Sequence, residues 1–270
     1  MKSTIRIASF VVAAVLMFTA CNSKKAKKDK APEIKKENVE KEVREFVYPL
    51  PTTFEVAEML NRIEAAYILS LSNPAGNAEK YLTEKAQAIN LGIYSADLSY
   101  ASTYNQQQET LDFMNASKTL IDKLDISPAL DSKLLEAIEN NLDNKDELVS
   151  VISNSFYNTY EYLNKNDRAP VSLLVISGSW VEALYIACHI SEETFSNKEM
   201  VAIIMKQKEP LNKLMTMLEV HAANEDVKST IDDLKILQEI YNSVDAGSIT
   251  MEQLEAIEKN IAVLREKYVS

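Results

Sequence analysis

Two groups of polar side chains in this sequence have the residue types and spacing that proton transfer or ligand binding requires. In the first, within residues 93–106, an acid occurs among phenols at helical spacing: Tyr94, Asp97, Tyr100 and Tyr104. The second follows one strip of the apolar stretch 171–190 and consists of Gly178, Glu182, Tyr185 and His189. An acid, a phenol and an imidazole on successive helical turns can donate and accept protons if they line a cavity.

The tyrosine-rich group is predicted to lie on the inner face of its helix. Small hydroxyl side chains occupy the opposite face: Ser95, Ser99, Ser102 and Thr103. Asp97 falls in the middle of the inner face, where a carboxylate needs hydrogen-bond partners that tyrosine hydroxyls can supply. Two interpretations stay open, a buried Asp–Tyr network that fixes helix packing and a ligand-binding role.

The second group contains Gly178, which we expect to be the one glycine inside a helix. Because Ser177 and Ser179 flank it, the position permits either a close approach of another helix or room for a ligand. A ligand or catalytic pocket would require the two groups to meet around a cavity, with Trp180 among its lining residues.

Other catalytic and metal-binding patterns are missing from the sequence. The two histidines, His189 and His221, do not complete a zinc site, and Glu182 precedes His189 by seven residues rather than the three of a di-iron motif. Cys188 has no basic neighbour and is interpreted as a buried thiol. We therefore expect no metal and no cofactor, and favour a protein without catalytic residues.

The stretch 171–190, VSLLVISGSWVEALYIACHI, is predicted to be the central helix of the fold. Its apolar side chains cover most of the helix circumference, as in a helix enclosed by others. Glu182 and His189 argue against a membrane span, since both would be costly in hydrocarbon.

The rest of the chain predicts an all-α single domain over residues 48–270, with about nine helices. We expect Thr52 or Thr53 to cap the first helix, Gly92 to end the second, and Pro210 to kink or break another. Strand patterns are not seen, and a compact irregular bundle is favoured over a short α-solenoid because no repeated signature occurs. The predicted ranges are 54–70, 78–90, 93–106, 107–124, 129–142, 145–164, 171–190, 198–222, 224–244 and 250–269.

Charge is distributed unevenly along the chain. Of 29 basic and 40 acidic residues, 11 and 6 precede residue 49, which leaves 18 and 34 in residues 49–270, a net charge of −16. Such an acidic body would repel nucleic acid, and we exclude that partner class. Residues 21–47 are rich in charge and poor in apolar side chains, which predicts a flexible tether.

The N-terminus begins with Lys2 and Arg6, continues with an apolar run too short to span a membrane, and ends Phe18-Thr19-Ala20-Cys21. This order of features resembles a bacterial lipobox. The resemblance implies that residues 1–20 are a signal peptide cleaved before Cys21, and that Cys21 carries diacylglycerol and an N-acyl chain. Three acyl chains would anchor the protein to a membrane essentially permanently.

The N-terminal region also resembles lipoproteins of Bacteroidetes, in which an acidic run after the cysteine marks export to the cell surface. Here the run is basic, with Lys24, Lys25, Lys27, Lys28 and Lys30, and Asn22 follows the cysteine. The resemblance therefore implies an outer-membrane anchor facing the periplasm. The stretch 48–105 is similar to uncharacterised helical lipoproteins of the same group, which implies no particular activity.

From these features we expect a lipid-anchored periplasmic protein that acts as a binding or scaffold module for another component of the cell envelope. The partner could be a protein or a small ligand. The alternative is a small-ligand receptor or enzyme whose pocket lies between the two polar groups described above.

Overall fold

The computed structural model of the chain describes residues 51–129, 133–191, 194–244 and 248–270, and in these residues it is all-helical, without β-strands. The predicted all-α class and compact arrangement are confirmed. Residues 1–20, the tether and Cys21 lie outside the described residues.

The α-helices of the described residues are α2 (Pro51–Arg62), α3 (Glu84–Thr103), α4 (Gln107–Lys123), α5 (Leu134–Asn140), α6 (Lys145–Lys165), α7 (Ala169–His189), α8 (Lys198–Lys206), α9 (Lys208–Val220), α10 (Glu225–Asn242) and α11 (Met251–Val269). Short 3-10 helices are η1 (Leu69–Leu71), η2 (Ala75–Lys80), η3 (Ser127–Ala129) and η4 (Thr194–Ser196).

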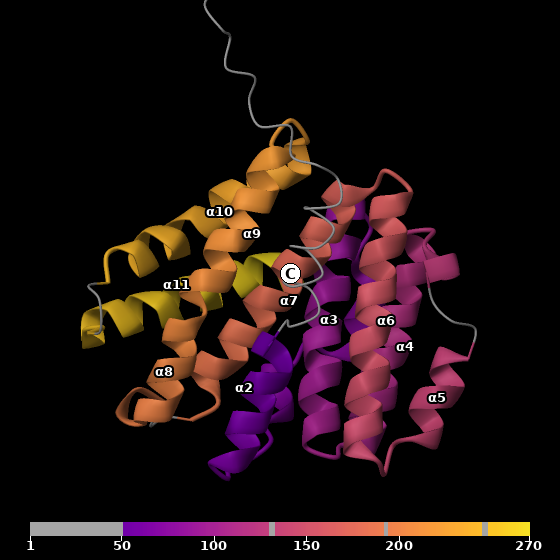
Figure 1. The fold of residues 1–270 in the computed structure, drawn as a ribbon, viewed down its shortest axis with the longest axis horizontal. Helices are drawn as coiled ribbons and strands as arrows, with labels where there is room; N and C mark the ends of the chain where they lie inside the picture. The colour runs from indigo at the N-terminus through magenta and orange to yellow at the C-terminus, as the bar shows by residue number, and fades with distance from the viewer. Residues whose placement is uncertain (1–50, 130–132, 192–193, 245–247) are drawn as a thin grey trace, which may run out of the picture.

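The predicted central helix is confirmed as α7. It is long and apolar enough to cross a membrane, with a mean hydropathy of 1.7, but 94% of that stretch is buried inside the fold. In Figure 1, α7 runs through the middle of the molecule, with α3, α4, α5 and α6 on one side and α8 to α11 on the other. Its apolar surface is therefore covered by protein, as in the core helix of a globular domain.

A second central helix, α3, was not expected from the sequence. Every residue of α3 from Ala88 to Thr103 is buried, and α3 makes its most extensive contact with α7. The small-hydroxyl face, predicted to point outwards, is buried as well. These hydroxyls reach back to carbonyl oxygens of their own helix, as Ser95 does to Leu91 at 2.7 Å and Thr103 to Ser99 at 2.8 Å. Hydrogen bonds of this kind replace those that the hydroxyls would otherwise make to water. A helix face of serine and threonine residues can therefore be buried.

The prediction that Gly92 ends a helix is wrong. Gly92 lies inside α3, and a Cβ atom built on it would lie 1.9 Å from the Val175 carbonyl oxygen of α7. A Cβ on Gly178 would lie 1.9 Å from the Ile89 carbonyl oxygen of α3. The two glycines therefore allow the backbones of α3 and α7 to touch, and the expected helices 78–90 and 93–106 are replaced by η2 and one long helix.

Other helix ends also differ from the predictions. The first helix was expected to reach Ser70, but α2 ends at Arg62, and Glu64 adopts a left-handed φ of 58°. The Ala65 amide then bonds back to the Leu60 carbonyl at 3.0 Å, a common way to end a helix. The break expected at Pro210 is confirmed, since α8 ends at Lys206 and α9 carries the proline in its first turn, where its missing N–H costs nothing.

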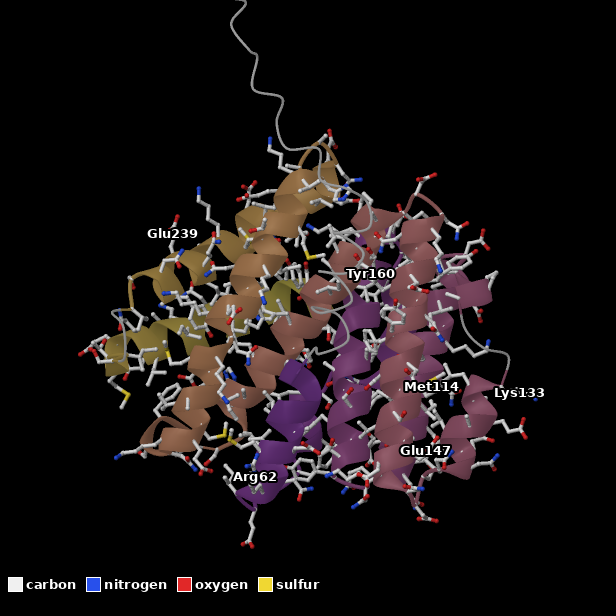
Figure 2. The ribbon with its side chains drawn as sticks, in the orientation of Figure 1. Arg62, Met114, Lys133, Glu147, Tyr160 and Glu239 are labelled. Carbon is white, nitrogen blue, oxygen red and sulfur yellow. The ribbon has the colours of Figure 1, made fainter. Side chains whose placement is uncertain are left out.

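Most charged side chains lie at the periphery of the fold, with Asp97, Glu182 and Arg265 as buried exceptions. Figure 2 shows Arg62, Glu147 and Glu239 on the outside of α2, α6 and α10, and all three are exposed. Trp180 of α7 and Tyr94 and Tyr100 of α3 are among the largest fully buried side chains. The polar groups worth examining for function are therefore those held between the two central helices.

Candidate functional site

Of the two polar groups predicted from the sequence, one residue from each, Asp97 of α3 and Glu182 of α7, lies at the contact between these helices. The Asp97 and Glu182 carboxyls lie near enough for each to affect the pKa of the other, and both side chains are fully buried, with 0% exposure. Both carboxyls lie in the most apolar part of the fold, where an isolated charge is expensive. Their neighbours must therefore compensate for the lost solvent.

The main compensating group is Arg265 of α11, a residue far away in sequence. Its Nε donates to Glu182 Oε2 at 3.0 Å and its Nη2 to Oε1 at 2.9 Å, which is a two-bonded ion pair. Nη2 also donates to the Leu71 carbonyl at 3.0 Å, and the guanidinium carbon lies 4.6 Å from the centre of the Tyr185 ring. One cation thus joins α7, α11 and the η1 turn.

Asp97 is held by the segment that follows η1. Its Oδ2 accepts a 3.0 Å hydrogen bond from the Asn73 backbone amide, while Oδ1 has no donor among the described residues. The Asn73 side chain continues the polar contacts by donating to Tyr81 at 2.9 Å and to Asn90 at 3.2 Å. Asp97 is therefore only half satisfied by hydrogen bonds if it is charged.

Burial raises the pKa of Asp97 well above its ordinary value, and the nearby Glu182 raises it further, whereas Arg265 and the Asn73 amide act against both. Burial also raises the pKa of Glu182, although the charge and hydrogen bonds of Arg265 oppose the increase. Burial alone would lower the pKa of Arg265, but Glu182 and Asp97 more than offset this and raise it. Arg265 is therefore always charged, and the pKa values of both carboxyls are raised.

No hydrogen bond in the described residues joins Asp97 to Tyr94, Tyr100 or Tyr104. The Asp–Tyr network that the sequence suggested is therefore not formed by these residues. The Tyr94 hydroxyl donates to the Pro74 carbonyl at 2.8 Å, and the Tyr100 hydroxyl accepts the Ile68 amide at 2.9 Å. Burial raises the pKa of Tyr100 to about 12. The two hydroxyls therefore form hydrogen bonds with the backbone of residues 68–74 and not with the Asp97 carboxyl.

Tyr104 belongs to a cluster of three rings at one end of the site. The Tyr104 ring centre lies 5.2 Å from that of Tyr100 and 5.7 Å from that of Tyr67, distances typical of packed aromatic side chains. The hydroxyls of Tyr67 and Tyr104 are buried without a hydrogen-bond partner. Ser72 interacts electrostatically with both Tyr67 and Asp97, but its hydroxyl also makes no hydrogen bond of normal geometry.

The remaining candidates on α7 have separate surroundings. Tyr185 stacks on His189 with ring centres 4.2 Å apart, and both side chains are partly exposed. His189 Nδ1 lies 2.8 Å from the Tyr185 carbonyl oxygen of its own helix. Trp180 is 1% exposed and its indole nitrogen has no partner. Gly178 contacts α3 backbone, so that of this strip only Glu182 joins the buried carboxyl pair.

Three cavities in the described residues are lined by other side chains. One of them, with a volume of about 610 Å³, lies between the end of α2 and the start of α8, where Ile63, Ile190 and Met200 line it. A second of about 530 Å³ is an open groove at the α8–α9 break, and a third near Ser95 holds only about 30 Å³. Neither Asp97 nor Glu182 lines any of these three.

Metal and thiol chemistry have little support in the described part of the chain. There, no group of three or more His, Cys, Asp or Glu side chains is arranged to hold a metal ion. Cys188 is buried, and burial raises the pKa of its thiol above the ordinary range, which keeps it protonated and unreactive.

Sequence reasoning missed Arg265 and Asn73, although Arg265 left a signal. It lies four residues after Ile261 and three before Tyr268, which places a cation on the apolar stripe of its helix. Asn73 left none, because it acts on Asp97 through its backbone amide, which every residue except proline possesses.

Comparison of the chain with protein-family models, curated proteins and solved structures finds no match. The interpretation of the site therefore depends on its own chemistry.

Proposed function

We propose that this protein is a lipid-anchored component of the periplasmic face of the outer membrane, and that its helical body binds or positions another envelope component. The observation that supports this most is the closed contact of Asp97, Glu182 and Arg265. Side chains that could have formed a reaction centre are used to hold α3, α7 and α11 together. A rigid body of this kind is suited to presenting a surface.

The anchor in this proposal depends on Cys21 and on the basic tether after it. The body carries a net charge of −16 over residues 49–270, so that a partner with a basic surface would be attracted to it. Anionic lipid headgroups would be repelled by the body and attracted by the tether lysines. This division of charge favours a protein that stands off the membrane and meets its partner with the helical body.

The proposal is tested by purifying the tagged full chain from detergent-solubilised envelope. We expect one envelope component to copurify, to bind the purified chain directly, and to bind more weakly as the salt concentration rises. A Cys21→Ala chain, prepared in parallel, shows whether capture depends on the anchor. Recovery of nothing specific, together with turnover of an envelope metabolite by the purified chain, would overturn the proposal.

A second candidate, a receptor for a small polar ligand or an enzyme, is favoured by one observation. Three buried oxygens near the α3–α7 contact, Tyr67 OH, Ser72 Oγ and Asp97 Oδ1, have no hydrogen-bond partner within the part of the chain that the structure describes. Unsatisfied buried groups of this kind are uncommon and can indicate a place for a bound molecule. Binding of small polar metabolites that raises the melting temperature of the wild type but not of Asp97→Asn would support this candidate; equal shifts in both would count against it.

A further inference from the structure

The charges at the α3–α7 contact do not balance if every group is ionised. Asp97 and Glu182 would contribute two negative charges, and Arg265 contributes one positive charge. All three side chains are buried, with exposures of 0%, 0% and 9%. A buried charge without a partner costs several kcal/mol, so that the neutral arrangement holds one additional proton.

The geometry also shows where this proton lies. Glu182 accepts two hydrogen bonds from Arg265, as expected of the charged carboxylate. Asp97 receives one backbone bond on Oδ2, has no donor for Oδ1, and faces Glu182. A protonated Asp97 can donate to Glu182, which satisfies both carboxyls at once.

The segment 68–73 is held mainly by polar contacts with these groups. The Ile68 amide donates to Tyr100, the Leu71 carbonyl accepts from Arg265, and the Asn73 amide donates to Asp97. Within the segment Leu71 is the one hydrophobic side chain that is buried, and Leu69 is 51% exposed. Segments with few apolar contacts open locally at a small free-energy cost.

We propose that Asp97 and Glu182 share a single proton across the α3–α7 contact, and that this proton latches residues 68–73 onto the helix pair until alkaline pH removes it. Loss of the proton places two carboxylates in contact, and Arg265 can compensate only one of them. The repulsion is relieved when Asp97 gains access to water, which requires the segment that covers it to move away.

Every charged or titratable group around Asp97 and Glu182 is consistent with a single shared proton. From α3, Tyr94 and Tyr100 face Asp97, and both are neutral because burial raises their pKa values. Tyr67 faces it from the segment before η1 and is neutral for the same reason. Ser72 contributes a hydroxyl, and Tyr81 and Tyr185 face the Glu182–Arg265 pair. Arg265 is thus the cation that these groups share.

Hydrogen–deuterium exchange of the purified full chain between pH 6 and pH 9, corrected for the intrinsic exchange rate, tests the proposal. In the wild type we expect the equilibrium constant for opening of peptides covering 68–73 to increase about tenfold per pH unit as the pH rises toward the folded-state pKa of Asp97, and to level off above that pKa, as required when opening releases one proton. Asp97→Asn has an amide that donates to Glu182 and never ionises, so that its opening is expected to stay constant. The exposed Asp112→Asn is the matched control and should behave as the wild type.

Two results would overturn the proposal: opening of 68–73 in the wild type that does not depend on pH, or an equal pH dependence in Asp97→Asn. If Asp97→Asn does not fold, carbon-13 NMR of the side-chain carboxyls in the wild type decides the matter. One protonated carboxyl of the Asp97–Glu182 pair at pH 7 supports the shared proton, whereas two ionised carboxyls contradict it.

Discussion

Gly92 of α3 and Gly178 of α7 face opposite helices at the same crossing, each against a backbone carbonyl of its neighbour. A Cβ on Gly92 would meet the Val175 carbonyl oxygen at 1.9 Å, and one on Gly178 the Ile89 carbonyl oxygen at 1.9 Å. Real Cβ atoms do not approach so closely, and the atoms in the way are backbone rather than flexible side chains. The separation of α3 and α7, and with it the Asp97–Glu182 contact, depends on these two glycines.

The first prediction concerns this crossing. Gly92→Ala and Gly178→Ala should each lower the free energy of unfolding by about 3 kcal/mol or more, because the helices must separate, and the better helix propensity of alanine returns only about 1 kcal/mol. Urea unfolding measures the change. Gly76→Ala is the control, since nothing lies within 4 Å of its added Cβ, and it should change stability by less than about 0.5 kcal/mol. Equal effects at Gly76 and Gly92 would contradict the close crossing.

The second prediction concerns the buried ion pair. Arg265→Met should destabilise the protein by about 3–5 kcal/mol, because it leaves the Glu182 carboxylate buried without a cation. Combining it with Glu182→Gln removes the unpaired charge and should recover part of the loss. Lys118→Ala, which breaks the exposed Lys118–Asp122 pair, should cost about 0.5 kcal/mol or less. Additive effects of the Arg265 and Glu182 changes would show that the two side chains act independently.

The third prediction is a pH dependence of stability. The pKa of Asp97 is raised in the folded protein, so that the native state holds one more proton than the unfolded chain, and stability falls as pH rises. The decrease begins near pH 4, the ordinary Asp value, and continues at about 1.4 kcal/mol per pH unit up to the folded-state pKa. Asp97→Asn should lack this contribution, so the difference in unfolding free energy between variant and wild type should grow with pH. A constant difference would contradict the assignment.

The fourth prediction concerns Cys188. The side chain is 2% exposed and burial raises the pKa of its thiol, so that native protein carrying Cys21→Ala should react with a thiol reagent at least ~100-fold more slowly than an exposed cysteine. The comparison is Ala222→Cys, placed at an exposed turn in a chain lacking both native cysteines. Denatured samples of the two should react equally fast.

The fifth prediction concerns the anchor. Cys21→Ala should leave the precursor uncleaved or release the protein into the soluble periplasmic fraction, because no acyl chain can be attached. Cell fractionation and immunoblotting measure both outcomes. A variant that is processed normally and stays in the membrane would show that Cys21 is not the anchor.

The parts of the fold that were predictable are those encoded by local pattern. The stretch 171–190 is apolar on nearly every side, a pattern typical of a helix enclosed by other helices or by lipid, and Glu182 and His189 favour the first. The break near Pro210 follows from the missing amide hydrogen of proline. Both features depend on neighbouring residues alone.

The misplaced helix end at Gly92 shows why other parts could not be predicted. Glycine is common at helix ends and at close helix crossings, since both exploit the missing Cβ, and the surrounding sequence does not distinguish them. The small hydroxyls of α3 were misleading for a related reason. Their polarity suggested solvent, whereas in the fold they bond to carbonyls of their own helix.

For the candidate site, the sequence alone determined the all-helical class, the central helix, the position of Asp97 on an inward face and that of Glu182 on the polar strip of the central helix, because helical periodicity is a local property. Only the tertiary structure decided that the two carboxyls lie near each other, that Arg265, 83 residues beyond Glu182, compensates one of them, and that the Asn73 amide holds the other. The reason is physical: the energy of a buried charge depends on whatever the fold brings within hydrogen-bonding distance, and such neighbours come from distant parts of the chain.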